Sequence, residues 1–187
     1  MAVGERIPPP KVLWAGGRKT SVSKENQSNI SVKVLPPREG RSLWLAADLY
    51  TIKVAGEDTD GTFTLFEVTA APQFGPPPHI HHREDETYYV LEGEFEFLDN
   101  DRVFTAGAGS FVYLPKGRLH MHKNAGDTPA RALVLNTPAG VEDFIEEGGE
   151  PATDPSSSPL PPEAQDLEKL VAIAPKYGIE VPPVAPG

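Results

Sequence analysis

The residues best able to do chemistry are the five histidines, which all lie between positions 75 and 124. His79 and His81 are two residues apart, and Glu86 follows five residues later. Two side chains spaced by two on an extended strand point to the same face, so both imidazoles can reach one metal ion. A third imidazole and a carboxylate can complete the ligand set from other strands. Neutral imidazoles with one carboxylate suit a divalent ion such as iron, nickel, manganese, cobalt or zinc.

The first histidine cluster resembles one half of the paired signature of the cupin superfamily. That half runs glycine, a short spacer, H-x-H, three or four residues, glutamate, six residues and glycine. It is matched here by His79, His81, Glu86 and Gly93. The chain departs from the pattern before His79, because only three residues, all proline, separate Gly75 from it where the family has five. This departure concerns the start of the strand and leaves the ligand set intact.

The second cluster resembles the other half of the signature, G-x5-P-x-G-x2-H-x3-N. Every fixed position is matched, by Gly109, Pro115, Gly117, His120 and Asn124. Two motifs in the right order are far more specific than one. The resemblance covers about residues 44–144, and it implies that one divalent metal ion is bound by four side chains: His79, His81, Glu86 and His120.

The spacing of short apolar stretches predicts an all-β domain. Residues 44–54 and 62–69 are rich in β-branched and aromatic types, and the turn sequence GEDTDG between them predicts a hairpin. Alternation in EFEFL, turns at Gly93, Asn100 and Gly117, and a last strand at 132–135 continue this pattern. The resemblance to cupins implies that these strands form a single jelly-roll barrel, the double-stranded β-helix.

The barrel is expected to occupy residues 41–148, between two irregular ends. Residues 1–40 form an extended N-terminal arm, with 30–34 as a candidate strand because apolar and polar residues alternate there. Residues 141–148 have helical spacing, and Gly148 ends that helix. Residues 149–187 comprise a Pro/Ser-rich linker, a second short helix that begins near Pro162 and packs back on the barrel or on a neighbour, and a tail that crosses the surface.

Side chains that share a face with the expected ligands are candidates for substrate contact. Tyr88 has the parity of Glu86 along a strand, and His122 has the parity of His120. We therefore expect Tyr88 and His122 to bind substrate. The alternatives are a tyrosine that only packs in the core and a histidine that is merely packed or solvated.

The remaining polar residues of the first cluster are expected at the surface. His82 has the opposite parity to His81, so it should point outward. Glu84 and Asp85 are expected to be solvated acids rather than further ligands. Glu86 has two compatible roles, as a ligand and as the base that takes a proton from a substrate hydroxyl.

Composition excludes several classes of function. The 17 basic against 27 acidic residues give a formal charge of -10, which disfavours nucleic acid and anionic membranes as partners. The absence of cysteine removes disulfides and thiol chemistry. No apolar run approaches a membrane span, and the first residues lack the apolar core of a signal peptide, so a cytoplasmic location is expected.

The resemblance to quercetin dioxygenase-like cupins implies a metal-dependent dioxygenase acting on an enolic or phenolic small molecule such as a flavonol, with Glu86 as the catalytic base. Its expected partners are that small molecule, dioxygen and a second copy of the chain in a homodimer. Two alternatives stay open, because one fold supports many functions. They are an oxygen-independent isomerase, epimerase or decarboxylase, and a non-catalytic module that binds a small molecule.

Overall fold

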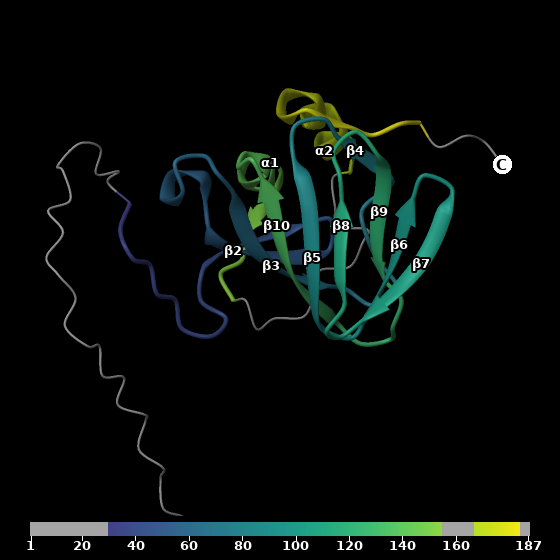
Figure 1. Ribbon diagram of the computed structural model, residues 1–187, viewed down its shortest axis with the longest axis horizontal. Coiled ribbons are helices and arrows are strands. Elements are labelled where there is room, and N and C mark those ends of the chain that lie inside the picture. Colours follow the sequence, from purple (N-terminus) through teal and green to yellow (C-terminus); the bar gives the residue numbers. More distant parts are fainter. Residues whose placement is uncertain (1–29, 155–166, 184–187) are drawn as a thin grey trace, which may run out of the picture.

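Two antiparallel sheets enclose the core in the computed structural model of the chain, which describes residues 30–154 and 167–183 (Figure 1). The larger sheet has the order β11 (Glu150–Pro151), β1 (Arg41–Leu45), β2 (Asp48–Val54), β3 (Thr64–Ala70), β10 (Ala130–Thr137), β5 (Asp85–Glu92) and β8 (Phe111–Leu114). The smaller sheet has the order β12 (Ile179–Glu180), β4 (His79–His81), β9 (Leu119–Asn124), β6 (Glu94–Asp99) and β7 (Arg102–Gly107). Neighbouring strands that are far apart in sequence, such as β3 and β10, are typical of a jelly roll. The predicted all-β double-stranded β-helix is confirmed.

Alternation along the strands determines which side chains enter the core. In β6, Phe95 and Phe97 are fully buried between the sheets, whereas their neighbours in sequence face outward. In β3, Phe66 and Val68 are buried in the same way. Because the side-chain period of a strand is two, this pattern fixes the register of each strand against the core. The EFEFL alternation thus correctly predicted a strand with two different faces, and the structure shows that the phenylalanine face is the inner one.

Turn positions were predicted well where the sequence carries turn residues and missed where it does not. Gly93, Gly117 and Asn100 all have positive φ, as their turns require. The stretch 44–54, expected as one strand, is instead the hairpin of β1 and β2, with Ala46 and Ala47 at φ of 48° and 70°. Positive φ is unfavourable for alanine. Nothing in the local sequence therefore marks this turn.

The candidate strand at 30–34 does not form. These residues have no regular secondary structure and pair with no strand that the structure describes, and Val32 and Val34 are 92% and 82% exposed. Without a partner edge, alternation alone gives a strand neither its hydrogen bonds nor a face to bury. The rest of the expected arm, residues 1–29, lies outside the described residues.

Two short helices follow the barrel strands: α1 (Val141–Gly148) and α2 (Leu167–Ile173), the second continued by a 3-10 turn at Ala174–Tyr177. Figure 1 shows α2 over one end of the barrel, near β4. The predicted end of α1 at Gly148 is confirmed, whereas the expected start of the second helix at Pro162 lies outside the described residues. Among the residues that the structure describes, no helix has the length and apolarity to cross a membrane.

The C-terminal tail was predicted wrongly. Instead of only crossing the surface, its residues Ile179 and Glu180 form β12, which pairs with β4 in the register Ile179 to His81. The backbone N–H of His82 also donates to the carbonyl of Gly178, at 2.9 Å. The reason is that β4 would otherwise have an unpaired edge, and backbone groups at an edge seek a partner. The last described residues therefore support the strand that carries two of the expected ligands.

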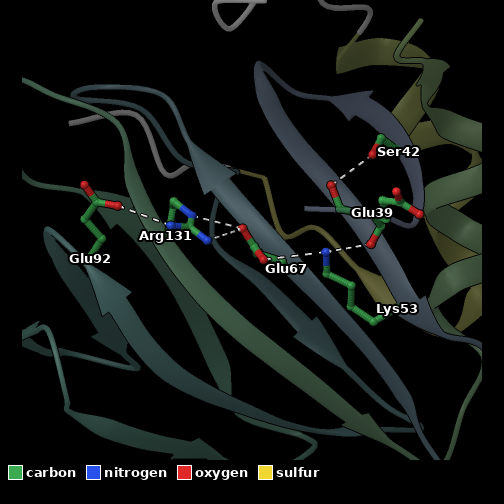
Figure 2. A network of polar contacts seen from close by, with 7 residues as sticks. Glu39, Ser42, Lys53, Glu67, Glu92 and Arg131 are labelled. Carbon is green, nitrogen blue, oxygen red and sulfur yellow. Dashed lines mark hydrogen bonds and ion pairs between the residues drawn. The ribbon is translucent and has the colours of Figure 1, made fainter. Parts of the chain in front are cut away.

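Charged side chains link four strands on the outer face of the larger sheet (Figure 2). Arg131 on β10 donates from Nη2 and Nε to Glu67 on β3, at 2.7 and 2.9 Å, and approaches Glu92 on β5 at 3.3 Å. Lys53 on β2 lies 3.6 Å from Glu67 and donates to the carbonyl of Glu39 at 2.9 Å. This network ties together the strands that form the wall opposite β4, on the side away from the core.

A buried carboxylate, Glu142, joins the start of α1 to the barrel. It accepts hydrogen bonds from the backbone N–H groups of Gly56 and Gly140, each at 2.7 Å, and from the hydroxyl of Thr64. Burial by itself would raise the pKa of Glu142, but these hydrogen bonds together hold it below its ordinary value.

We expect Glu142→Ala to lower the free energy of unfolding at neutral pH by about 2 kcal/mol, because three donors lose a charged acceptor. Since the folded-state pKa of Glu142 is depressed, its contribution is complete above the unfolded pKa near 4.5 and is lost as pH falls through the folded value. Urea titrations at neutral and acidic pH measure this. The exposed Asp143→Ala, in the same turn, is the control, with an effect within about 0.5 kcal/mol. Equal losses in both variants, or a loss independent of pH, would contradict the expectation.

Candidate metal centre

Three strands bring the four expected ligands to one place inside the barrel. His79 and His81 lie on β4, and His120 lies beside His79 on the neighbouring β9. Glu86 reaches the same place from β5 in the opposite sheet. One nitrogen or carboxylate oxygen from each of these residues lies within 4.8 Å of the corresponding atoms of the others. Such a cluster of three imidazoles and a carboxylate could hold a metal ion.

Backbone carbonyls orient two of the imidazoles. His79 donates from Nδ1 to the carbonyl of Pro77 at 2.9 Å, and His120 donates from Nδ1 to the carbonyl of Arg118 at 3.0 Å. A neutral imidazole that donates from one nitrogen presents a lone pair on the other. In both residues Nε2 is therefore the nitrogen available to a ligand, the usual arrangement of metal-binding histidines.

The third imidazole, that of His81, is oriented by a carboxylate whose position was predicted wrongly. Glu84, expected to be solvated, is only 3% exposed, and its Oε2 lies 3.4 Å from Nδ1 of His81. The chain bends between β4 and β5, which turns Glu84 back under the strand it has just left. The three-residue spacing from His81 was the available signal. A carboxylate on the far nitrogen of a ligand histidine holds its orientation and raises its basicity.

Glu86 and His120 present polar atoms that lack hydrogen bonds. Oε1 of Glu86 accepts from Nδ2 of Asn136 at 3.2 Å, whereas Oε2 has no hydrogen-bond partner among the described residues. Nε2 of His120 is likewise buried without one, and it lies 3.3 Å from that oxygen. Buried polar atoms are costly unless they are paired. A cation between these two atoms would satisfy both, so the residues present fit a metal ion.

The charge states of Glu86 and His79 also suit a cation. Burial opposes ionisation of Glu86, but its contact with His120 and its electrostatic interactions with the nearby imidazoles hold its pKa well below the usual range. Burial, together with repulsion from His81 and His120, lowers the pKa of His79 well below its ordinary value. At neutral pH the site therefore contains a carboxylate and a neutral imidazole, the forms that bind metals.

The ligand cluster lies at one side of a cavity with mostly apolar walls. Helices α1 and α2 supply much of the wall, and no lysine or arginine lines it among the described residues. The lining side chains from outside the ligand set are Leu45, Ala46, Tyr50, Phe66, Pro76, Pro77, Tyr88, His122, Val141, Phe144, Ile145, Leu167, Leu170, Val171, Ile179 and Val181. A pocket with apolar walls and a few convergent polar groups is the usual form of a small-molecule site.

Tyr88 and His122, the two expected substrate contacts, both line this cavity. They are 2% and 3% exposed, and the hydroxyl of Tyr88 lies 2.9 Å from Nδ1 of His122. Burial, and next the charge of Glu86, raise the pKa of Tyr88 well above 10, so it remains a phenol at neutral pH. The parity that placed both residues inward was correct.

Other predicted positions are explained by structure rather than chemistry. His82 points to the surface as expected, where it pairs with Glu180 at 2.8 Å. Asn124 donates to the carbonyls of Ala70 and Thr128 at 3.1 and 2.8 Å, which closes the end of the barrel. Gly75, at the departure from the family pattern, lies so close to β9 that a Cβ there would be 2.0 Å from the carbonyl oxygen of His122.

Two residues of the site carried no signal in the sequence. Asn136 lies directly opposite Glu86 in the pairing of β10 with β5. Asp48 is fully buried at the start of β2, and its Oδ2 lies 3.7 Å from Nε2 of His122. Burial raises the pKa of Asp48, with the interaction with His122 working in the opposite direction. Both residues come from strands distant in sequence from the histidine clusters, so only the fold brings them to the site.

Comparisons with known proteins agree with this architecture. The family described as "Cupin domain" matches residues 66–136. Germin-like protein 5-1 of Oryza sativa subsp. japonica is 35% identical over 86 residues, 43% of this chain and 38% of the relative. Quercetin 2,3-dioxygenase of Bacillus subtilis is 26% identical over 118 residues, 63% of this chain and 35% of the relative. The chain thus spans little more than a third of the length of these curated relatives.

Solved structures that match include KdgF from a Halomonas species, with 18% identity and a TM-score of 0.47 over 52% of this chain and 85% of that one. A conserved protein with a double-stranded β-helix domain from Klebsiella pneumoniae matches with 20% identity and a TM-score of 0.44, over 60% of this chain and 92% of that one. The family match, the paired signature and the two-sheet fold together show that residues 66–136 belong to a cupin domain.

Proposed function

We propose that the protein is a metal-dependent dioxygenase acting on an enolic or phenolic small molecule of the flavonol type. The observation that carries this proposal is the position of the cluster of His79, His81, Glu86 and His120, beside a cavity with apolar walls. The similarity to quercetin 2,3-dioxygenase of Bacillus subtilis supports it at low identity. The similarity to germin-like protein 5-1 has a higher identity over a shorter stretch, and it supports only the shared family.

The four clustered side chains would hold a divalent iron, nickel, manganese, cobalt or zinc ion. Such an ion, when bound, supplies Lewis-acid activation of an enolic or phenolic oxygen and, if redox-active, electron exchange with dioxygen. Glu84 holds His81 in place, and backbone carbonyls hold His79 and His120. These contacts fix the ligand geometry before substrate arrives.

Glu86 is the proposed base. Its Oε1 is held by Asn136, whereas its Oε2 has no hydrogen-bond partner among the described residues and can accept the proton of a substrate hydroxyl. Loss of that proton makes the substrate an electron-rich enolate or phenolate, the form that reacts with dioxygen. A well-placed base contributes about 10² to 10⁴ in rate.

The cavity wall favours a neutral, largely aromatic substrate. Phe66 and Phe144 offer aromatic contacts, and Leu170 on α2 adds aliphatic surface. The absence of lysine and arginine from the described lining leaves no permanent cation for a polycarboxylate or a phosphorylated sugar. The wall thus supports the oxygenase over the alternative of a decarboxylase or isomerase of small anionic substrates.

We expect His79→Ala and His120→Ala each to abolish stoichiometric binding of Fe(II), Ni(II) or Co(II) while the barrel stays folded, because the core packing does not depend on these ligands. Metal content measured by inductively coupled plasma mass spectrometry and thermal unfolding followed by circular dichroism test this. His82→Ala, which removes the exposed imidazole next to the site, is the matched control and should keep the metal. Full metal content in either ligand variant would contradict a metal centre at these residues. Unfolding of either variant would contradict the expectation that the ligands are not needed for the fold.

The metal-loaded protein should consume about one molecule of dioxygen per molecule of flavonol oxidised, measured with an oxygen electrode and by loss of flavonol absorbance. Glu86→Gln, assayed after its metal content is matched to the unaltered protein, should be slower by about 10² or more. No oxygen uptake with any of iron, nickel, manganese or cobalt, across a panel of flavonols and catechols, would refute the dioxygenase. Turnover that continues without oxygen would favour the Lewis-acid alternative.

A further inference from the structure

A buried chain of polar groups runs from the cavity into the barrel wall, apart from the ligand cluster. It begins at the hydroxyl of Tyr88 in the cavity, continues through both nitrogens of His122 and ends at Asp48 on β2. All three side chains are at most 3% exposed. Tyr88 lies two residues from Glu86 on the same face of β5, so its hydroxyl is on the same cavity as the ligand cluster.

Only one of the two oxygen atoms of the Asp48 carboxyl group has a structural role. Its Oδ1 accepts the backbone N–H of Ala71 at 2.8 Å, which secures the end of β3. Its Oδ2 and Nε2 of His122 are both buried without a hydrogen-bond partner among the described residues, and they face each other across 3.7 Å. A shift of a few tenths of an ångström would bring them within hydrogen-bond distance. These unpaired atoms point to a further role for Asp48.

The donor and acceptor capacities of the three groups determine the direction in which the hydrogen bonds run between them. A carboxylate can only accept hydrogen bonds, so a histidine that faces Asp48 presents Nε2–H to it. In a neutral imidazole Nδ1 is then an acceptor, and the contact at 2.9 Å requires the hydroxyl of Tyr88 to donate to it. The oxygen of Tyr88, a residue that lines the cavity, therefore keeps its lone pairs as hydrogen-bond acceptors.

We propose that Tyr88 accepts a hydrogen bond from a second hydroxyl group of the substrate, and that Asp48 and His122 are positioning residues that fix the direction of its own O–H. This site selects hydroxylated ligands with a donor next to the oxygen that faces the ligand cluster, such as catechols or hydroxylated enols. The choice of ligand rests on the proposed function, whereas the direction of the hydrogen-bond chain does not.

Asp48→Asn is expected to reverse the direction of these hydrogen bonds with little change in side-chain size. If the amide oxygen keeps the N–H of Ala71, the amide nitrogen faces His122 and can only donate to it. His122 must then accept at Nε2 and carry its hydrogen on Nδ1, which donates to the oxygen of Tyr88. The O–H of Tyr88 turns toward the cavity, and the site changes from a hydrogen-bond acceptor to a donor.

Nitrogen-15 NMR of the full chain with labelled histidines, recorded at neutral pH with and without zinc, determines which nitrogen of His122 carries the hydrogen. We expect His122 to be the Nε2–H tautomer in the unaltered protein and the Nδ1–H tautomer in Asp48→Asn. Asp143→Asn, a surface change of the same kind, should leave the tautomer unchanged, and Tyr88→Phe should retain Nε2–H. An Nδ1–H tautomer in the unaltered protein overturns the proposal, even if Asp48→Asn fails to fold.

Ligand selectivity gives a second readout. Zinc-loaded protein is titrated calorimetrically with catechol and with its monomethyl ether, which lacks the second donor. We expect the ratio of their affinities to fall by about tenfold in Asp48→Asn and in Tyr88→Phe, relative to the unaltered protein. An unchanged ratio in variants that bind zinc normally overturns the substrate role of Tyr88. Binding of neither compound, with the expected tautomers present, contradicts the proposed substrate class and leaves the direction of the chain established.

Discussion

The candidate metal centre and its cavity depend on the convergence of four side chains from two opposing sheets. The pairing of β4 with β9 places His79 beside His120, and the facing sheet supplies Glu86. This convergence buries three imidazoles and a carboxylate near one another, which is unfavourable unless their lone pairs and charges are compensated. Oxygen atoms compensate the outer nitrogens of the imidazoles. The inner atoms Oε2 of Glu86 and Nε2 of His120 have no such partner among the described residues, and a bound cation would supply one.

Elements outside the barrel signature complete the surroundings of this centre. The short β4 is paired on its second edge by β12, which the C-terminal segment supplies. The same segment contributes α2, whose apolar residues form part of the cavity wall with those of α1. Part of the apolar wall of the cavity therefore comes from regions that the family match at residues 66–136 does not reach. Cupins with the same ligands but different ends can accordingly accept different substrates.

Polar groups in this barrel fall into two kinds. Glu142 and Asn124 are structural, because the polar atoms of their side chains form hydrogen bonds with backbone groups and, for Glu142, with Thr64. Glu86, His120, His122 and Asp48 each have one buried atom without a hydrogen-bond partner among the described residues. Because natural proteins rarely leave such atoms unpaired, their concentration in one part of the barrel marks this region as a candidate functional site rather than a purely structural network.

The sequence by itself determined the barrel, the four clustered side chains and the inward parity of Tyr88 and His122, because a period of two and a paired motif are local properties. Tertiary structure decided what depends on contacts between distant segments. The Ala46–Ala47 turn carries no turn residue, the β12 strand forms only because β4 offers an edge, and Glu84 is buried by a bend. Asn136 and Asp48 reach the site through sheet pairing and packing across the barrel, and no local pattern encodes such neighbours.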